Sequence, residues 1–324
     1  MTKKNQEKIL ITGASGFIGG HLMNSLKQDG KDVVGVDLKS DCKDVIKADL
    51  SEPETVKDAL KDCSIVIHTA AMVSNAMSDE EMWKTNVVNT SNLIKLAIEC
   101  NVKRFVHISS IVVYGNIAEG EINEKIPVNS TGGNYVHTKI LSEHALLQAK
   151  LKNDIELVIL RPGDVYGPGS RPWIIEPIKA IKNRQFMLPA KGQGFFRPVF
   201  IDDLIKGIKL ACHAESASGE IINLSCEGYV TTEEYFTYHY QWLGKSKPLV
   251  VSTKTALILS IITTFIFKLF GRLNEASPAT VHQLSTKSWY SIKKAQKLLG
   301  WRPETSLDNG MKVSKIWAND QGLL

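Results

Sequence analysis

A glycine-rich turn between an apolar run and an amphipathic segment constrains the fold of this chain most strongly. Residues 8–12 form a short β-type run, Gly13, Gly16 and Gly19 follow it directly, and apolar residues recur at helical spacing from Leu22 onward. Glycine lets the backbone bend tightly and approach a pyrophosphate, which then meets the unpaired N–H groups of the following helix. A glycine cluster alone is usually an ordinary turn, but this context favours a phosphate-binding βα turn.

A second β-type run, residues 32–37, ends in a carboxylate. Asp37 lies eighteen residues beyond Gly19, where an acidic residue accepts hydrogen bonds from an adenosine ribose. A carboxylate there also repels a 2′-phosphate. We therefore expect NAD rather than NADP as the cofactor, although the neighbouring Lys39 weakens the distinction.

Strand and helix patterns alternate through the first half of the chain. This alternation predicts an α/β fold, a Rossmann doubly wound parallel sheet with ligands at the carboxyl ends of its strands. The expected strands are 45–50, 64–71, 104–109 and 157–160, and the expected long helices are about 82–100 and 135–151. Beyond residue 169 prolines and glycines become frequent. We expect residues 1–169 to form the NAD-binding domain and residues 170–324 a smaller mixed substrate lobe, some segments of which return to the sheet.

Tyr135 and Lys139 are spaced to share one face of the second long helix, one turn apart. We expect the ammonium of Lys139 to favour the phenolate and lower the pKa of Tyr135 from about 10 towards neutrality. Ser110, which precedes a Tyr114-Gly115 pair, supplies a hydroxyl to hold a substrate oxygen. The three residues predict a proton-transfer site for a carbinol or carbonyl carbon, with NAD carrying the hydride.

Composition excludes several classes. The chain has 324 residues, 43% of them hydrophobic, and its net charge of +5 comes from scattered lysines rather than a basic stripe, so nucleic-acid binding is not expected. Its five cysteines are dispersed and not at metal-ligand spacing, which predicts reduced thiols, no metal site and a cytoplasmic location. No apolar core of a signal peptide follows the first lysines.

The ordered set of motifs resembles the extended short-chain dehydrogenase/reductases, the NAD-dependent epimerase/dehydratase superfamily. The motifs are residues 12–19, 49–50, 68–71, 85–87, 109–115, 135–143, 160–168, 199–204 and 294–310. The resemblance implies that Tyr135 is the general acid/base, that Lys139 holds the nicotinamide ribose and lowers the pKa of Tyr135, and that Ser110 positions the substrate oxygen. It also implies a homodimer formed by the two long helices, whose outer faces we expect to carry Leu96, Leu146 and Leu147.

The same resemblance predicts the residues that contact NAD. Asp49 reaches the adenine amino group or caps the next helix, and Asn86 supports the catalytic residues or packs its helix. The predicted cofactor contacts are Gly13, Ser15, Gly16, Phe17, Ile18, Gly19, Asp37, Asp49, Leu50, Ala70, Ala71, Asn86, Tyr135, Lys139, Pro162 and Val165.

Three neighbours of these motifs bear on the reaction. Sugar-nucleotide dehydratases carry an Asp-Glu pair directly after the catalytic hydroxyl residue, where this chain has Ile111 and Val112, so elimination is disfavoured. Many nucleotide-sugar epimerases place an Asn, which contacts the diphosphate, where this chain has Asp164. The segment is more similar to the 3β-hydroxysteroid dehydrogenase branch. We predict an NAD-dependent oxidoreductase that interconverts a secondary alcohol and a ketone, with a lipophilic small-molecule substrate favoured; the alternative is a nucleotide-sugar epimerase with tightly bound NAD.

Two later features keep alternatives open. Arg197 is a substrate-side cation or a partner of Asp202 and Asp203. Residues 255–267 carry no charge and are too few to span a bilayer as a helix. Three interpretations remain for the region 255–270: a core helix of the substrate lobe, a lid over a lipophilic substrate, or a peripheral contact with membrane.

Overall fold

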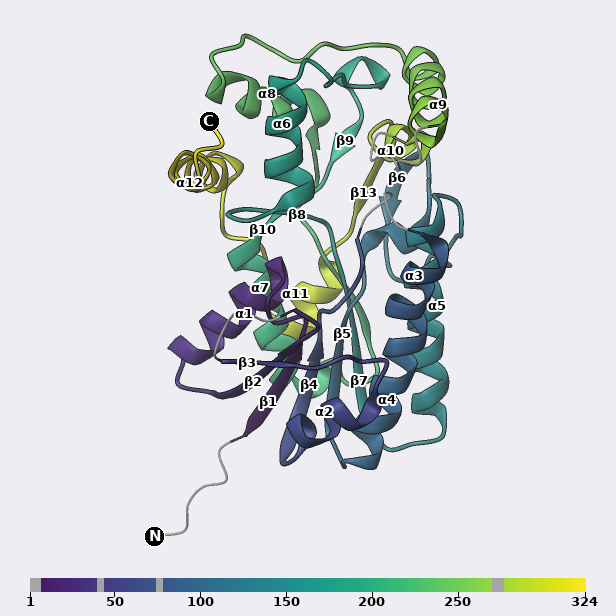
Figure 1. Cartoon of the computed structure of the whole chain (residues 1–324), viewed down its shortest axis with the longest axis vertical. Coiled ribbons are helices and arrows are strands. Elements are labelled where there is room, and N and C mark those ends of the chain that lie inside the picture. The colour runs from purple at the N-terminus through teal and green to yellow at the C-terminus, as the bar shows by residue number, and fades with distance from the viewer. Residues whose placement is uncertain (1–6, 40–43, 74–77, 270–276) are drawn as a thin grey trace.

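The computed structural model describes residues 7–39, 44–73, 78–269 and 277–324. Within them, the central element is a seven-stranded sheet in the spatial order β11-β7-β5-β4-β1-β2-β3, and every neighbouring pair is parallel (Figure 1). Its strands are β1 (Lys8–Thr12), β2 (Asp32–Asp37), β3 (Val45–Lys47), β4 (Cys63–His68), β5 (Arg104–Ile108), β7 (Glu156–Pro162) and β11 (Ile221–Leu224). This is the predicted Rossmann doubly wound sheet, in which the order reverses between β1 and β4.

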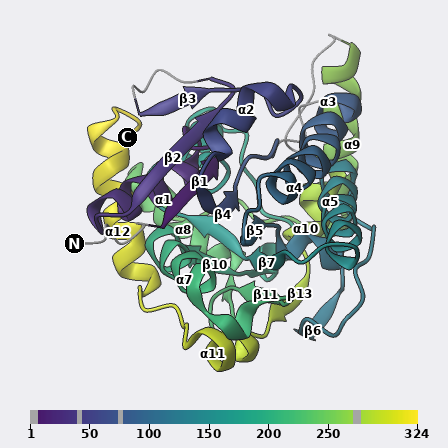
Figure 2. The same ribbon diagram turned by 90° about the horizontal axis from the view of Figure 1, so that it is seen from below.

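Helices cover both faces of the sheet (Figure 2). One face packs against α1 (Phe17–Gln28), α7 (Ile201–His213) and α11 (Lys293–Leu299), and the other against α2 (Pro53–Leu60), α4 (Asn89–Glu99) and α5 (Asn134–Leu151). Each interface is a separate cluster of buried apolar side chains. Strands buried on both faces explain the near-continuous apolar runs of the sequence.

The smaller sheets and remaining helices lie beyond the carboxyl ends of the central strands (Figure 1). Three two-stranded sheets pair β8 (Asp164–Tyr166) with β10 (Pro198–Phe200), β9 (Phe195–Phe196) with β12 (Val230–Thr231), and β6 (Glu119–Ile122) with β13 (Lys287–Tyr290). The helices there are α6 (Glu176–Lys182), α8 (Thr232–Trp242), α9 (Thr253–Leu269), α10 (Pro278–Gln283) and α12 (Leu307–Asp320). Residues 221–224, although late in the chain, extend the central sheet next to β7.

The first long helix is less regular than predicted. Instead of one helix over about 82–100, the chain forms α3 (Asp79–Trp83), a π-helical turn η1 (Lys84–Val88) and α4. The π turn contains Asn86, and such turns are frequent at functional sites. By contrast, the second long helix begins and ends within a residue of its predicted bounds.

The expected outer face of the long helices is wrong in two positions. Leu96 and Leu146 are buried in the core between these helices and the sheet. The large apolar residues that are exposed along α3, η1 and α5 are Trp83, Val88, Leu141 and, at the end of α5, Leu151. The helical pattern alone did not reveal which stripe faces the sheet.

Helix α9 is not the core helix that one interpretation of residues 255–267 required. Ala256 and Ser260 are buried, but Ile261, Phe265 and Leu269 are 58%, 63% and 69% exposed. No helix in the described ranges is long and apolar enough to cross a bilayer.

Candidate active site

The glycine turn between β1 and α1 is shaped by close backbone approaches. Gly13 has a φ of +69°, and a Cβ there would lie 2.8 Å from the backbone N and Cα of Ala70. A Cβ on Gly19 would lie 2.1 Å from the carbonyl oxygen of Gly13 and 2.7 Å from Thr69 Oγ1. Neither position accommodates a side chain, because the turn after β1 packs directly on the chain leaving β4.

The start of α1 is open to a ligand. The helix is capped by Gly16, which provides no side-chain hydrogen bond to the first turn, and both Ser15 and Gly16 are exposed. The Asp37 carboxylate lies beside this turn: its Oδ2 accepts a hydrogen bond from Ser15 N at 3.0 Å and its Oδ1 one from Lys39 N at 3.2 Å. Uncapped N–H groups and an acid at the end of β2 therefore meet at one place.

A buried hydrogen-bond chain lies behind the turn. Thr90 Oγ1 donates to Asn86 O at 2.8 Å, so it accepts from His68 Nε2, also at 2.8 Å. The other ring nitrogen, Nδ1, then accepts from Thr12 Oγ1 at 2.7 Å. Burial lowers the pKa of His68 to about 3, with a smaller contribution from the Lys139 charge, and keeps the imidazole neutral. His68 thus links β1 to α4 and the π turn as a structural residue.

Lys139 is buried on α5, and its ammonium donates to the carbonyl of Ile108 at 2.7 Å. Ile108 ends β5, and Ser110 follows two residues later, where its Oγ accepts from Val112 N at 3.3 Å and caps a short 3₁₀ turn. Tyr135 lies one helical turn before Lys139. The contact between Lys139 and the end of β5 brings the Ser, Tyr and Lys segments together at the carboxyl edge of the sheet.

The protonation states differ from those predicted. Burial raises the pKa of Tyr135, and no lowering by Lys139 accompanies it. Burial lowers the pKa of Lys139 to about 8, against a smaller opposing effect of Glu143. The expectation that Lys139 brings the phenol towards neutrality is therefore wrong for the chain by itself. Tyr135 is protonated at neutral pH.

A buried ion pair fixes α5 against the sheet. Arg161 Nη2 and Nε lie 2.6 Å and 3.0 Å from the two carboxylate oxygens of Glu143, one turn beyond Lys139, and both side chains are buried. Ser109 Oγ donates to the same carboxylate at 2.5 Å. The Arg161 guanidinium also lies 4.7 Å from the centre of the Tyr114 ring. These contacts connect three of the family-like motifs and hold the catalytic helix in one register.

Asn86 joins two parts of the site. Its amide exchanges hydrogen bonds with both backbone groups of Met72, at 2.8 Å and 3.0 Å, and donates to Thr138 Oγ1 at 3.0 Å. It therefore holds the chain after β4 against α5 between Tyr135 and Lys139. Thr138 was not among the predicted residues; its place inside the Tyr-x-x-x-Lys segment was the only signal available.

The remaining predicted cofactor contacts line the same edge of the sheet. Asp49 Oδ1 accepts from Ser51 N at 2.8 Å, so it orders the turn before α2, while Glu52 occupies the N-cap position itself. The other predicted contacts are partly exposed, apart from the buried Pro162. Phe17 and Ile18 begin α1, Val165 lies in β8, and Leu50, Ala70, Ala71 and Pro162 lie at or just beyond strand ends.

Comparison with known proteins places this site in a family. A model of the NAD-dependent epimerase/dehydratase family matches residues 9–225, about two thirds of the chain. The chain belongs to this family. A relative from Arabidopsis thaliana, 3β-hydroxysteroid-dehydrogenase/decarboxylase isoform 1, is 22% identical over 94% of this chain and 77% of its own length. UDP-glucuronate 4-epimerase from Thermodesulfobacterium geofontis is 26% identical and covers 96% of each chain.

Solved structures share the fold. UDP-glucuronic acid 4-epimerase from Bacillus cereus, in complex with NAD, has a TM-score of 0.78 to this chain at 23% identity, covering 97% of this chain and 99% of the other. Family membership makes NAD the cofactor. The residues present fit it: the turn packs on the chain after β4 only because Gly13 and Gly19 lack a Cβ, the first N–H groups of α1 have no side-chain cap, and Asp37 lies beside them.

Asp164 and Arg197 form a second buried ion pair. Arg197 Nε lies 3.4 Å from Asp164 Oδ2, which also accepts from the backbone N of Arg197 at 3.1 Å, and Gln283 Nε2 lies 3.5 Å from Oδ1. Arg197 Nη1 donates to Phe195 O at 2.6 Å. Burial raises the pKa of Asp164, and Arg197 opposes that rise. Arg197 thus pairs with Asp164, not with the predicted Asp202 and Asp203.

Asp203 binds the C-terminal segment instead of Arg197. It lies in the first turn of α7, where its carboxylate accepts from the backbone N of Glu304 and Thr305 at 3.1 Å and 3.0 Å. The N-cap position is occupied by Phe200. Asp203 therefore fixes the C-terminal segment on α7.

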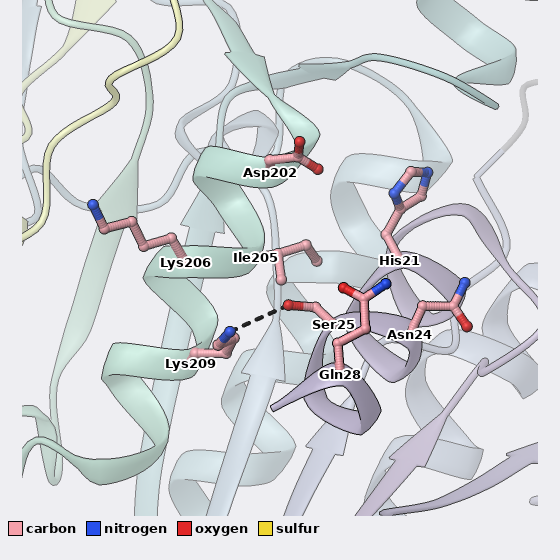
Figure 3. A pocket seen from close by; sticks show the side chains of 8 residues that line it. All are labelled: His21, Asn24, Ser25, Gln28, Asp202, Ile205, Lys206 and Lys209. Atoms are coloured by element: carbon pink, nitrogen blue, oxygen red, sulfur yellow. Dashed lines mark hydrogen bonds between the residues drawn. The ribbon is translucent and has the colours of Figure 1, made fainter. Parts of the chain in front are cut away.

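An open hollow of about 550 Å³ lies outside this site, between α1 and α7 (Figure 3). Its lining is His21, Asn24, Ser25, Gln28, Asp202, Ile205, Lys206 and Lys209. Lys209 Nζ donates to Ser25 Oγ at 3.2 Å and pairs with Asp29 across it. None of the predicted site residues lines this hollow, and both of its lysines are already paired, Lys206 with Glu304 and Lys209 with Asp29.

Proposed function

We propose that this protein is an NAD-dependent oxidoreductase that interconverts a secondary alcohol and a ketone. The observation that carries the proposal is the arrangement at the end of β5, where buried Lys139 binds the Ile108 carbonyl and brings Tyr135 to the segment of Ser110, on the same edge as the glycine turn. NAD, when bound, exchanges hydride with the substrate carbon. Tyr135 exchanges the hydroxyl proton, and Ser110 holds the oxygen that carries it.

The surroundings of this site support oxidation rather than elimination. Ile111, directly after Ser110, is buried in an apolar cluster against which Val112 also packs, so neither position offers a group that exchanges protons. A second proton-transfer residue, which elimination requires next to the acid/base, is absent from these two positions.

The Asp164–Arg197 pair supports a substrate without a diphosphate. Both charges are buried and compensate one another. Arg197 is held by Asp164, Phe195 and Thr286, and Asp164 by Arg197 and Gln283, so the position where many epimerases place an Asn is part of a buried ion pair. Nucleotide-sugar epimerisation stays the alternative, favoured by the end-to-end similarity to a UDP-glucuronate 4-epimerase.

Turnover assays test the proposal. Purified protein is incubated with NAD and a panel of lipophilic secondary alcohols, including 3β-hydroxysterols, and separately with UDP-sugars, while NADH and products are followed. We expect NADH to accumulate with an alcohol, and we expect Tyr135→Phe to lower kcat by about 10²–10⁴-fold with NAD binding retained. Epimerised UDP-sugar without net NADH would overturn the proposal, as would full activity of the Phe variant.

The protonation state of Tyr135 sets a pH dependence. Because burial raises the pKa of this phenol, its acid form predominates at neutral pH. Ketone reduction, which consumes a proton from Tyr135, is expected to be fast near neutrality. Alcohol oxidation, which needs the phenolate, is expected to rise continuously towards alkaline pH, and pH profiles of kcat in both directions measure the difference.

A further inference from the structure

Helix α9 exposes most of its large apolar side chains, unlike an ordinary surface helix. Its inward face, which packs near α10, carries Ala256, Ser260, Thr263 and Thr264 together with the half-buried Leu257 and Phe267. Thr264 Oγ1 is even buried without a hydrogen-bond partner. A globular helix normally buries its apolar stripe and exposes the polar one.

The outward face of α9 is almost wholly apolar. At 100° per residue, its exposed large side chains occupy one continuous side of the helix and recur at spacings of three and four. They are Ile258, Leu259, Ile261, Ile262, Phe265, Ile266 and Leu269. Leu249 and Val250, in the segment that leads into the helix, are exposed as well. Single exposed apolar residues need no explanation, but a contiguous patch of this kind marks an interaction surface.

The charges that flank this helix in the sequence have one sign. From Gly244 to Leu273 the sequence contains five basic residues and no acidic one. Lys247 and Lys254 are exposed next to the helix, and Lys254 lies on the border of its outward face. Basic residues flanking an apolar helix face complement an anionic lipid surface. Two copies of this chain meeting symmetrically through the same face would bring these like charges together.

The described part of α9 is too short to span a bilayer. It has seventeen residues and extends about 26 Å, whereas a spanning helix needs about 20 apolar residues. We propose that α9 binds an anionic membrane surface, lying in its plane with the Ile258–Leu269 side in the lipid and the flanking lysines at the headgroups. The partner is therefore the bilayer itself, and the attachment is peripheral.

This orientation gives the active site a fixed relation to the membrane. Helix α9 packs on α10, and Ala279 of α10 lies opposite Gly133, which caps the helix of Tyr135 two residues before it (Figure 1). Gln283, at the end of α10, contacts Asp164. A lipid-bound α9 holds the substrate-side end of the sheet near the bilayer.

Vesicle co-sedimentation of the full chain tests the proposal and does not depend on the reaction. We expect binding to vesicles of phosphatidylcholine with phosphatidylglycerol, and weaker binding to phosphatidylcholine alone. Ile262→Glu/Phe265→Glu should lower the bound fraction at least about tenfold, because it places two charges in the lipid. The matched control is Val313→Glu/Ile316→Glu, at the same spacing on the exposed side of α12.

Two further measurements make the outcome decisive. Lys247→Glu/Lys254→Glu should weaken binding to the anionic vesicles and leave binding to neutral ones unchanged, and thermal unfolding should be the same for all variants. Failure of the native chain to bind anionic vesicles overturns the proposal. An equal loss of vesicle binding in the α12 control also overturns it. The same holds if the chain does not bind vesicles and sedimentation shows that the α9 substitutions dissociate a dimer.

Discussion

At the scale of single residues, His68 shows how burial determines a charge state. The ring sits between Thr12 and Thr90 and stacks on His107 with a centroid distance of 5.3 Å. Both hydroxyls are oriented for a neutral imidazole, and burial lowers the pKa to about 3. His68 lies next to the predicted cofactor-binding edge, yet it contributes rigidity to the fold rather than acid/base chemistry.

This burial predicts an acid-sensitive stability. Because the folded pKa of His68 lies below its unfolded value, the unfolded chain takes up the proton first, and stability falls as the pH drops from about 6.5 towards 3. Between about pH 7 and pH 5 His68 alone should remove about 2 kcal/mol from the free energy of unfolding. Urea unfolding at both pH values should show a smaller difference for His68→Asn than for the native chain. An identical difference would contradict the assignment, and exposed His144→Asn is the control.

At the scale of elements, the adjacent glycines Gly19 and Gly20, which follow the turn between β1 and α1, have different roles. Gly19 touches the Gly13 carbonyl and Thr69, whereas a Cβ on Gly20 would lie 3.5 Å from Ala14 O, an ordinary contact. Both residues are in the first turns of α1. Only Gly19 must be a glycine, because only there does the backbone approach too closely for a Cβ.

Alanine substitution should therefore have opposite effects at these positions. Gly19→Ala should destabilise the chain by about 2 kcal/mol or more, because the new methyl overlaps backbone, and should abolish NAD binding. Gly20→Ala should raise stability by up to about 1 kcal/mol through helix propensity, with NAD affinity kept. Thermal unfolding and fluorescence titration with NAD measure both effects. Equal behaviour of the two variants would disprove this account of the turn.

Much of this element level was predictable from local pattern. The helix of Tyr135, the glycine turn and the runs of β1, β2, β5 and β7 follow from periodicity and turn residues that involve only neighbours in the chain. The π turn around Asn86 was not predictable, because it accompanies hydrogen bonds of Asn86 with Met72 and Thr138, which belong to other segments of the chain.

At the scale of the whole molecule, two of the exposed apolar surfaces among the described residues bear on association. One is the outward face of α9, and the other runs along α3, η1 and α5, where Trp83, Val88 and Leu141 are exposed. We propose that the latter side forms a homodimer. The two surfaces belong to different helices, so that pairing through α3–α5 does not use the face of α9.

Sedimentation of substituted chains separates these surfaces. Trp83→Glu/Leu141→Glu should shift the native dimer to monomer, because charges replace the apolar centre of the interface. Val313→Glu on α12 is the control, and the α9 substitutions should leave the dimer intact. A monomeric native chain, or a dimer that survives Trp83→Glu/Leu141→Glu, would refute the placement.

Local sequence determines the sheet, the glycine turn, the acid after β2 and the helical face shared by Tyr135 and Lys139, since each depends on periodicity or on one residue's backbone freedom. Tertiary packing decides the partners and the orientation. The sequence does not determine whether Ser260 and Thr264 face water or protein; the packing of α9 beside α10 does. Likewise, Arg197 pairs with Asp164 only because β8 and β10 run side by side. The pKa of Tyr135 also depends on tertiary packing, because burial in the folded chain raises it.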